Sequence, residues 1–270
     1  MLYLIDASVY VFRAYYSMPP DMLDREGNAA HALFGFARFL GDLIERAKPR
    51  YLAVAFDESL ETSFRNRIDP TYKANREPAP ADLKLQFGRC REFCEHLGVA
   101  HFGSGEYEAD DIIGTLHARF RREGLPATLV TRDKDLAQLV REGDVYWNYT
   151  DNLRLQHHEI EGHFGVAPER YADYLALTGD AVDNIKGVPG VGPKTAAVLL
   201  KDGGTYRAFE RACTHQGTSV DWQAGSGDFL CSNHGARFSA EGGVTMGPAN
   251  SPLRAIEVSV AADGTVTYRR

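Results

Sequence analysis

The sequence predicts an α/β fold with a mostly parallel sheet flanked by helices, followed by a small, incomplete β-rich segment. Three observations support this prediction. Over the first two hundred residues, short apolar runs alternate with longer helical patterns. Each of these apolar runs is followed by an acidic residue. After about Lys201 the helical patterns stop, and short β-like pieces separated by turn residues take their place.

The first predicted elements form the core of the fold. Residues 2–5, 51–56 and 127–131 are short, apolar and bounded by polar residues, as buried parallel strands are. Residues 31–47 predict a helix between the first two strands, because their apolar side chains lie along one stripe. That stripe consists of Leu33, Phe36, Leu40, Leu43, Ile44 and Ala47.

Further helices are predicted downstream. Residues 83–97 and 110–124 have helical patterns and separate the second strand from the third. Residues 168–201 are interpreted as a helical hairpin, which the turn-rich stretch 179–194 divides. The expected order of strands and helices is therefore that of a parallel sheet.

The last predicted strands are residues 255–260 and 265–268, which lie among Gly, Asp and Asn-Ser-Pro turns. We therefore expect an α/β core over residues 1–167, the helical hairpin over 168–201 and a β-rich segment over 202–270. The change from helical patterns to short β-like pieces falls near residues 202–205.

The bulk properties limit the function. The net charge is −7, and residues 205–270 hold six basic and six acidic side chains, so the negative excess lies in residues 1–204. An acidic protein can still bind nucleic acid if its carboxylates hold cations and its basic residues are grouped locally. The sequence has neither a membrane-spanning run nor the pattern of a signal peptide, which predicts a cytoplasmic protein. Cys90 and Cys94 lie on an apolar helical face and are predicted to be reduced core thiols.

Acidic residues gather in five clusters after predicted strands and at helix starts. The carboxyl ends of parallel strands line one crevice, and so many carboxylates cannot stay ionised together without compensating charge. Each acid alone could instead be a helix N-cap, but the clusters together favour Mg²⁺ or Mn²⁺ binding. The nine acids are Asp6, Asp57, Glu108, Asp110, Asp111, Asp133, Asp135, Asp180 and Asp183.

Six segments carry a resemblance to a known family. They are "LIDAS", "AFDES", "FRNRIDPTYKANR", "EYEADDIIG", "VTRDKDLAQLV" and "LTGDAVDNIKGVPGVGPKTA". Residues 1–201 thereby resemble the 5′ nuclease or flap endonuclease family, which includes the 5′→3′ exonuclease domain of bacterial DNA polymerase I. The resemblance implies that the nine acids hold metal directly or through water. It also implies two metals about 4 Å apart that activate a water and stabilise the leaving 3′ oxygen, which yields a 5′ phosphate.

A basic segment follows the second predicted strand. Arg65, Arg67, Lys73 and Arg76 lie within twelve residues, with Tyr72 beside them. The segment could be a solvated loop, but its position after an active-site strand suits it to gripping a phosphodiester near the metals. The resemblance places it in an arch or clamp over about residues 63–82, where Lys73 and Arg76 would be catalytic contacts to the scissile phosphate.

A glycine-rich turn opens the second helix of the hairpin. Small residues let backbone N–H groups approach a phosphate at a helix N-terminus. The resemblance implies a helix-three-turn-helix that binds the backbone of duplex DNA, and a K⁺ ion held by carbonyl oxygens of residues 187–192. The expected DNA-binding residues here are Gly187, Gly190, Gly192, Lys194 and Thr195.

The tail carries a different metal-binding pattern. Cys213-x-His215 and Cys231-x-x-His234 could bind Zn²⁺, although the spacing is not typical of a zinc finger. Residues 205–270 resemble a truncated Rieske domain, in which two Cys bind one iron of a 2Fe–2S cluster and two His the other. Few residues precede the first pair, so we expect unpaired strand edges, an unfinished core and poor cluster assembly.

Three functions follow in order of support. The first is a metal-dependent 5′→3′ exonuclease or flap endonuclease that acts as a monomer on DNA with 5′ ends, flaps or nicks. The second is a Rieske-type electron-transfer protein with the first part as a carrier. The third is a DNA-junction binder without catalysis, which the complete set of carboxylates disfavours.

Overall fold

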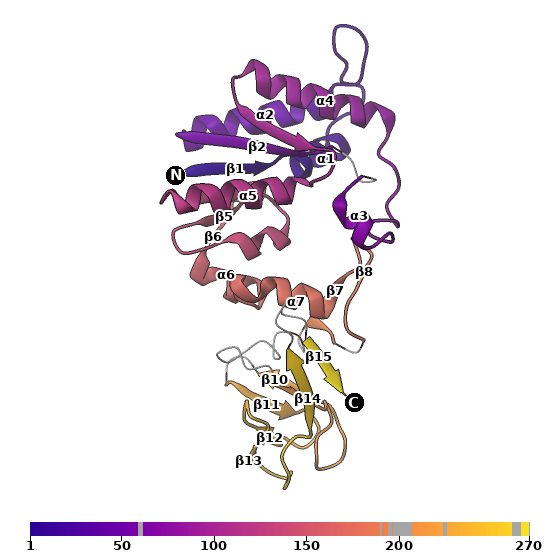
Figure 1. Cartoon of the computed structure of the whole chain (residues 1–270), viewed down its shortest axis with the longest axis vertical. Helices are drawn as coiled ribbons and strands as arrows, with labels where there is room; N and C mark the ends of the chain where they lie inside the picture. Colours follow the sequence, from indigo (N-terminus) through magenta and orange to yellow (C-terminus); the bar gives the residue numbers. More distant parts are fainter. Residues whose placement is uncertain are drawn as a thin grey trace. The chain divides into compact units, whose positions relative to one another are not determined.

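The structure is a computed structural model that describes residues 1–58, 62–189, 191–193, 196, 207–223, 226–260 and 266–269 (Figure 1). It divides into two compact units. The first is Met1–Tyr171 with Ala181–Ile185, and the second is Ala172–Asp180 with Lys186–Arg270. Among the helices that the structure describes, none combines the length and apolar character needed to cross a membrane.

The first unit contains a six-stranded sheet in the order β3-β2-β1-β4-β5-β6. The neighbouring pairs are parallel except for β5 and β6, which are antiparallel. The predicted parallel sheet is therefore confirmed. The strands are β1 (Leu2–Asp6), β2 (Tyr51–Asp57), β3 (Ala100–Ser104), β4 (Ala127–Val130), β5 (Val145–Asn148) and β6 (Leu153–Gln156).

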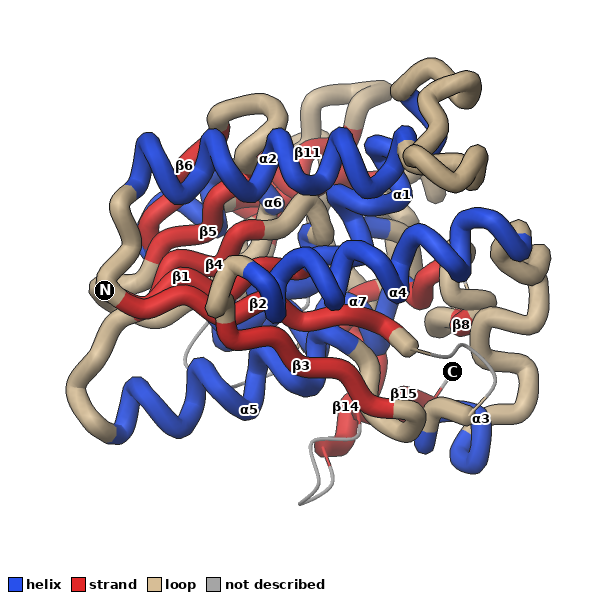
Figure 2. Tube along the Cα trace, turned by 90° about the horizontal axis from the view of Figure 1, so that it is seen from above, coloured by secondary structure: helices blue, strands red, loops and turns tan. Residues whose placement is uncertain are grey.

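Helices cover both faces of this sheet. Figure 2 shows α2 and α4 on one face and α5 on the other. The helices and turns of the first unit are α1 (Ala7–Ser17), α2 (His31–Ala47), α3 (Phe64–Ile68), α4 (Ala81–His96), α5 (Ala109–Arg122) and α6 (His157–Phe164), with 3-10 turns η1 (Lys134–Leu139) and η2 (Pro168–Arg170). The predicted helices over 31–47, 83–97 and 110–124 correspond to α2, α4 and α5.

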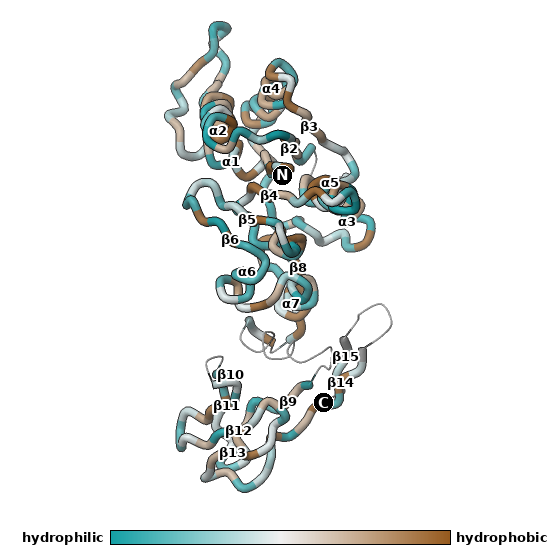
Figure 3. Tube along the Cα trace, turned by 90° about the vertical axis from the view of Figure 1, so that its left-hand side faces the viewer, coloured by the Kyte–Doolittle hydropathy of each residue, from teal (hydrophilic) through white to brown (hydrophobic). Residues whose placement is uncertain are grey.

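The hydrophobic core lies between β1, β2 and the helices α1, α2 and α4. Phe36, Leu40 and Leu43 of α2 are fully buried there, as their helical spacing predicted. Cys90 and Cys94 are also fully buried and free, which confirms their predicted place in the core. Figure 3 shows hydrophobic and hydrophilic stretches alternating along these helices, as in amphipathic helices that pack on a sheet.

The second unit begins with the predicted hairpin. Its first helix is confirmed as α7 (Tyr171–Thr178), which is followed by β7 (Gly179–Asp180) and β8 (Ile185–Lys186). A Cβ atom on Gly187 would lie 2.3 Å from the carbonyl carbon of Thr178, so close backbone packing requires glycine there. Most of the predicted second helix lies outside the described residues.

The tail folds into two small antiparallel sheets. One has the order β10-β11-β12-β13 and the other β15-β14-β9. The strands are β9 (Ala208–Phe209), β10 (Val220–Gln223), β11 (Asp228–Cys231), β12 (Arg237–Phe238), β13 (Val244–Met246), β14 (Ala255–Val260) and β15 (Val266–Arg269). The last two correspond to the predicted strands over 255–260 and 265–268.

This tail has a core of its own. Val220, Phe229 and Phe238 are buried together with Cys213 and Cys231. Phe229 also packs edge-to-face against Phe209 and Trp222. The described residues thus differ from the expectation of an unfinished core, because side chains from four short strands and their loops close over the two cysteines.

Candidate active site

Three predicted acids meet at one edge of the six-stranded sheet. β1 lies between β2 and β4, and the three strands are parallel. β1 ends at Asp6 and β2 at Asp57, while β4 ends at Val130 and leads to Asp133. Because the strand order reverses between β1 and β4, this edge is the topological switch point at which open α/β sheets bind ligands.

Asp6 is the most strongly enclosed of the three. It is 3% exposed, and its Oδ2 atom accepts a hydrogen bond of 2.9 Å from the Thr131 hydroxyl. Burial raises the pKa of Asp6 to about 7 and nearby Asp57 and Asp133 contribute to the rise, which the Thr131 hydrogen bond opposes. An ionised Asp6 is therefore unfavourable unless a cation compensates its charge.

The start of α5 brings further acids to the same edge. Glu108 is the N-cap of α5, and Asp110 lies in its first turn. The Ala109 N–H donates to Asp57 Oδ1 at 2.7 Å, which fixes the start of the helix to the end of β2. Burial raises the pKa of Asp110 well above its usual value, and the charges of Asp6, Asp133, Asp57 and Glu108 raise it further.

Asp133 and Asp135 open the η1 turn after β4. The Asp133 N–H donates to the Thr131 hydroxyl oxygen at 2.9 Å, and Asp133 Oδ1 accepts from the Asp135 N–H at 2.8 Å. Asp133 is therefore held in place by its own turn while its charge is felt by Asp6 and Asp110. Local hydrogen bonds of this kind are typical of an N-cap, as the alternative interpretation of these acids expected, and their role as metal ligands stays a prediction.

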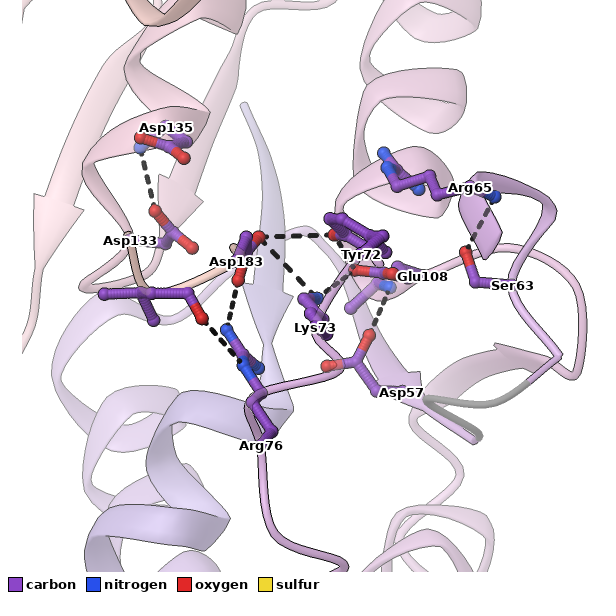
Figure 4. A network of polar contacts seen from close by, with 12 residues as sticks. Asp57, Ser63, Arg65, Tyr72, Lys73, Arg76, Glu108, Asp133, Asp135 and Asp183 are labelled. Carbon is purple, nitrogen blue, oxygen red and sulfur yellow. Dashed lines mark hydrogen bonds and ion pairs between the residues drawn. The ribbon is translucent and has the colours of Figure 1, made fainter. Parts of the chain in front are cut away.

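The basic segment after α3 supplies positive charge to this cluster (Figure 4). Lys73 Nζ lies 2.5 Å from Glu108 Oε2 and 3.9 Å from Asp183 Oδ2, and the Lys73 side chain is only 9% exposed. Arg76 forms an ion pair with Asp183. The backbone is fixed as well, because the Lys73 N–H donates to the Asp183 carbonyl at 2.9 Å. The predicted catalytic cations thus contact two of the predicted metal-binding acids.

The acids fit divalent cations. The raised pKa values of Asp6 and Asp110 show that uncompensated negative charge is concentrated here. The buried Glu108 Oε1 atom has no hydrogen-bond partner among the described residues. Carboxylate oxygens are the donors that Mg²⁺ and Mn²⁺ prefer. Within the described ranges, no three His, Cys, Asp or Glu side chains surround one point as a finished ion site.

Two predicted DNA-binding arginines contact carboxylates. Arg65 makes two hydrogen bonds to Asp111, which was itself a predicted metal ligand. Arg67 pairs with Glu106, and the side chains of both residues are well exposed. The aromatic ring of Tyr72 is buried, and its hydroxyl lies 3.2 Å from both Glu108 Oε2 and Asp183 Oδ2.

The hairpin residues belong to the second unit. Asp180 lies in β7 of the second unit, whereas the other eight predicted acids lie in the first unit. Gly187 and Gly192 are described, and the close contact of Gly187 with Thr178 is explained by packing. Gly190, Lys194 and Thr195 lie outside the described residues, and so does part of the expected K⁺ site over 187–192.

Two supporting residues were not predicted. Thr131 bridges Asp6 and Asp133, as described above. Ser8 accepts a hydrogen bond of 3.1 Å from the Asp57 N–H and so ties the first turn of α1 to the end of β2. Both hydroxyls lie within two residues of a predicted acid, in "IDAS" and "VTRD". That adjacency is the only sequence signal that could have identified them.

The tail contains a second candidate site, built from two similar loops. The Cys213 N–H donates to the Thr218 carbonyl at 2.7 Å, and the Cys231 N–H donates to the Ala236 carbonyl at 2.8 Å. Each loop closes with a second bond, from Gly217 N–H to the Cys213 carbonyl and from Gly235 N–H to the Cys231 carbonyl. Both glycines have positive φ, of 75° and 73°, so each loop depends on a left-handed residue.

These loops bring the two cysteines near one another and the two histidines near one another. The Cys213 thiol lies close enough to the Cys231 sulfur to influence the pKa of Cys231. The rings of His215 and His234 lie edge-to-face, with centroids 4.9 Å apart. The N–H of His234 lowers the pKa of Cys231, and the N–H of Asn233 and the Cys213 thiol act in the same direction against burial. A sulfur that is stabilised as a thiolate is suited to binding metal.

Comparison with known protein families covers most of the chain. Residues 1–165 match the model of the 5′-3′ exonuclease N-terminal resolvase-like domain, and residues 166–220 match that of the 5′-3′ exonuclease C-terminal SAM fold. A 5′-3′ exonuclease of Aquifex aeolicus is 38% identical over 204 residues, which are 76% of this chain and 70% of that protein. DNA polymerase I of Rhizobium leguminosarum is also 38% identical, but this chain spans only 21% of its length.

Solved structures show the same fold. The T5 D15 protein co-crystallised with metal ions superposes with a TM-score of 0.62 at 20% identity and covers 74% of each chain. A structure of T5 5′-exonuclease with zinc bound has a TM-score of 0.59. The plasma membrane Rieske protein PetC3 of Synechocystis matches 27% of this chain at 32% identity, with a TM-score of 0.25.

Proposed function

The chain belongs to the 5′-3′ exonuclease family and is a nuclease, and we propose that it cleaves DNA phosphodiesters at 5′ ends, flaps or nicks with two divalent cations. The observation that supports this most strongly is the packing of Asp6, Asp57, Asp110 and Asp133, which raises the pKa of Asp6 and Asp110. Such crowding of like charges is unfavourable in a purely structural cluster and is relieved by cations.

The proposed ligands come from both sides of the switch point. When bound, Mg²⁺ or Mn²⁺ would supply an activated water and stabilise the leaving 3′ oxygen. Asp180 lies in the second unit, and its role as a metal ligand stays a prediction from the sequence. Asp111 is left out of the set because its oxygens already accept hydrogen bonds from Arg65 and from the Glu108 N–H. The first-unit ligands are Asp6, Asp57, Glu108, Asp110, Asp133, Asp135 and Asp183.

The chain's own cations have the second role. Lys73 and Arg76 compensate Glu108 and Asp183 while no divalent cation is bound. We expect both to turn toward the scissile phosphate once cations take over that compensation, and to stabilise the charge that develops on it. Arg67 and Tyr72 would hold the nearby strand. The hairpin around Gly187 would bind duplex backbone, assisted by K⁺ on carbonyls of residues 187–192.

A direct assay tests this function. An end-labelled duplex with a 5′ flap is incubated with the protein and Mg²⁺, with an excess of EDTA, and with EDTA followed by added Mg²⁺. We expect cleavage in the first and third samples only, with products that carry a 5′ phosphate. The Asp110→Asn variant should lose at least about a hundredfold in rate. Cleavage that persists in EDTA, or an intact flap in every sample, refutes the proposal.

A second function is favoured by the convergence of the cysteine loops. We propose that Cys213, Cys231, His215 and His234 hold a 2Fe–2S cluster, with sulfur ligands on one iron and imidazoles on the other. The paired sulfurs and the adjacent imidazole rings support this arrangement. Protein purified from iron-supplemented cells should contain two iron atoms per chain and a visible spectrum that the Cys231→Ser variant lacks. A colourless protein that retains zinc refutes it.

The proposal also includes a monomer in the cytoplasm. Seven of the proposed metal-binding acids lie in the first unit of one chain, so the proposed site uses no ligand from a second copy. Sedimentation of the protein alone and with flap DNA tests this, since a dimer in both samples would refute it.

A further inference from the structure

Two arginine–carboxylate pairs of different exposure connect helix α3 to the first turn of α5 and to the segment just before it. In the first, Arg65 Nη1 lies 2.5 Å from Asp111 Oδ2, and Nη2 lies 2.9 Å from Asp111 Oδ1. In the second, Arg67 pairs with Glu106. The side chains of Arg65 and Asp111 are 28% and 25% exposed, whereas those of Arg67 and Glu106 are 68% and 45% exposed. Only the first pair is placed to act on the active site.

The oxygens of the Asp111 carboxylate already accept most of the hydrogen bonds that they can accept. Besides the two bonds from Arg65, Asp111 Oδ2 accepts a bond of 3.0 Å from the Glu108 N–H, as the second half of a capping box. Three hydrogen bonds leave little capacity on a group with about four acceptor sites. Bidentate arginine pairs are also among the strongest polar contacts in proteins. Asp111 therefore differs from Asp6 and Asp110, whose charge lacks such compensation.

The Arg65 guanidinium also lies near Tyr72, whose hydroxyl lies between Glu108 and Asp183. Its guanidinium lies 4.8 Å from the centroid of the Phe64 ring and 6.0 Å from that of the Tyr72 ring. The Tyr72 hydroxyl in turn lies 3.2 Å from both Glu108 Oε2 and Asp183 Oδ2. Figure 4 shows Tyr72 and Lys73 between these two acids. Arg65 thus lies at cation–π distance from the Tyr72 ring, to which Lys73 Nζ lies closer, at 4.9 Å from the centroid.

We propose that Arg65 and Asp111 form a positioning pair rather than a phosphate contact and a metal ligand. This inference rests on the proposed nuclease function. Asp111 fixes the backbone of Glu108, and Arg65 fixes the ring of Tyr72, so Glu108 and Asp183 face one another across the place where a cation is expected. Supporting residues of this kind orient the ligands and typically contribute about 10–100-fold in metal affinity or activity.

The test compares four variants of the pair and one control variant with the wild type. Arg65→Met and Asp111→Asn each break the pair, Arg65→Lys keeps the charge without the paired bonds, and the double variant removes both partners. Glu106→Gln is the matched control, because it breaks the exposed pair on the same helix. The readouts are Mn²⁺ affinity by electron paramagnetic resonance, and kcat and KM on flap DNA. Tryptophan emission and a urea titration in EDTA verify that each variant folds.

We expect Arg65→Met and Asp111→Asn to weaken Mn²⁺ binding by about tenfold and to lower kcat by about 10–100-fold, with KM for DNA within about twofold. Arg65→Lys should not restore either value, because ammonium cannot replace the bidentate contact. The double variant should be no worse than either single one, since the pair acts as a unit. Glu106→Gln should behave like the wild type.

Three results overturn the inference. A rise in KM for DNA at unchanged Mn²⁺ affinity in Arg65→Met would make Arg65 a phosphate contact. A much larger loss of Mn²⁺ binding in Asp111→Asn than in Arg65→Met, with additive effects in the double variant, would make Asp111 a direct ligand. Wild-type behaviour of every variant would leave the pair without a role. By contrast, a wild-type protein that neither binds Mn²⁺ nor cleaves DNA would refute the nuclease proposal itself.

Discussion

Replacing Asp6 by asparagine should stabilise the metal-free first unit at pH 8, although it removes a central acid of the site. Asp6 is 3% exposed and lies among carboxylates, so its ionised form is unfavourable in the folded protein. Asparagine has nearly the same shape and keeps an oxygen that can accept the Thr131 hydrogen bond. It carries no charge to bury.

The magnitude follows from the pKa of Asp6, which rises from 3.8 to about 7 on folding. Below pH 3.8 both states hold the proton, so the carboxyl has no unfavourable effect. As the pH rises toward 7, the unfolded state ionises first and the folded protein loses about 1.4 kcal/mol per pH unit. Above about pH 7 the loss is complete, at about 4 kcal/mol. The variant does not undergo this loss.

The assay is urea unfolding in EDTA between pH 4 and 8, followed by the emission of Trp147 in a Trp222→Phe background. The protein has two tryptophans, and Trp222 belongs to the second unit. The stability difference between Asp6→Asn and the parent should grow from near zero at pH 4 to about 4 kcal/mol at pH 8. The exposed Asp21→Asn should shift stability by less than about 0.5 kcal/mol. A difference that is constant with pH, or that favours the parent at pH 8, refutes the reasoning.

Three further variants test other contacts. Lys73→Met leaves the buried Glu108 carboxylate without its cation and should destabilise the EDTA-treated protein by about 3 kcal/mol; Mg²⁺ should restore most of this in the urea titration, and equal losses with and without Mg²⁺ would contradict it. Asp144 is buried and accepts hydrogen bonds from His117 and from the Ala127 and Arg141 N–H groups, which outweigh burial and lower its pKa. Asp144→Asn should therefore destabilise the folded protein by about 3 kcal/mol at pH 7. This loss should shrink as the pH falls below 4, because the ionised carboxylate then no longer contributes to stability. An equal loss of stability at pH 3.5 would contradict this expectation. Gly187→Ala places a Cβ 2.3 Å from the Thr178 backbone and should weaken duplex binding in an anisotropy assay by about tenfold, whereas Gly162→Ala, which has open space around it, should bind as the wild type does.

The parts of the fold with strong local patterns could be predicted from the sequence. β1, β2 and β4 are buried apolar runs, and α2 has a clear apolar stripe. β3 (Ala100–Ser104) was missed because it is partly exposed and contains His101 and Gly103, which weaken a strand pattern. The alternation in β6 is only four residues long, too short to distinguish from a loop.

The site was predictable in its acids but not in their partners. An acid after a parallel strand has its place fixed by the sheet, so Asp6, Asp57 and Asp133 could be assigned from sequence. The pairing of Arg65 with Asp111, 46 residues apart, depends on how α3 packs beside α5, and long side chains can reach several acids. The same holds for Lys73 and Glu108. In the tail, the spacing of the Cys and His residues predicts a set of ligands, but the core around Cys213 and Cys231 depends on tertiary packing that spacing does not reveal.

We propose above all that the acids at the β1–β4 edge hold the cations with which the protein cleaves DNA. The most direct test measures Mn²⁺ occupancy by electron paramagnetic resonance and flap cleavage in the same samples over a Mn²⁺ titration. We expect two bound ions per chain, cleavage that rises with occupancy of the second ion, and loss of both signals in Asp110→Asn. Cleavage that is complete before any Mn²⁺ binds, or unchanged occupancy in Asp110→Asn, would contradict it.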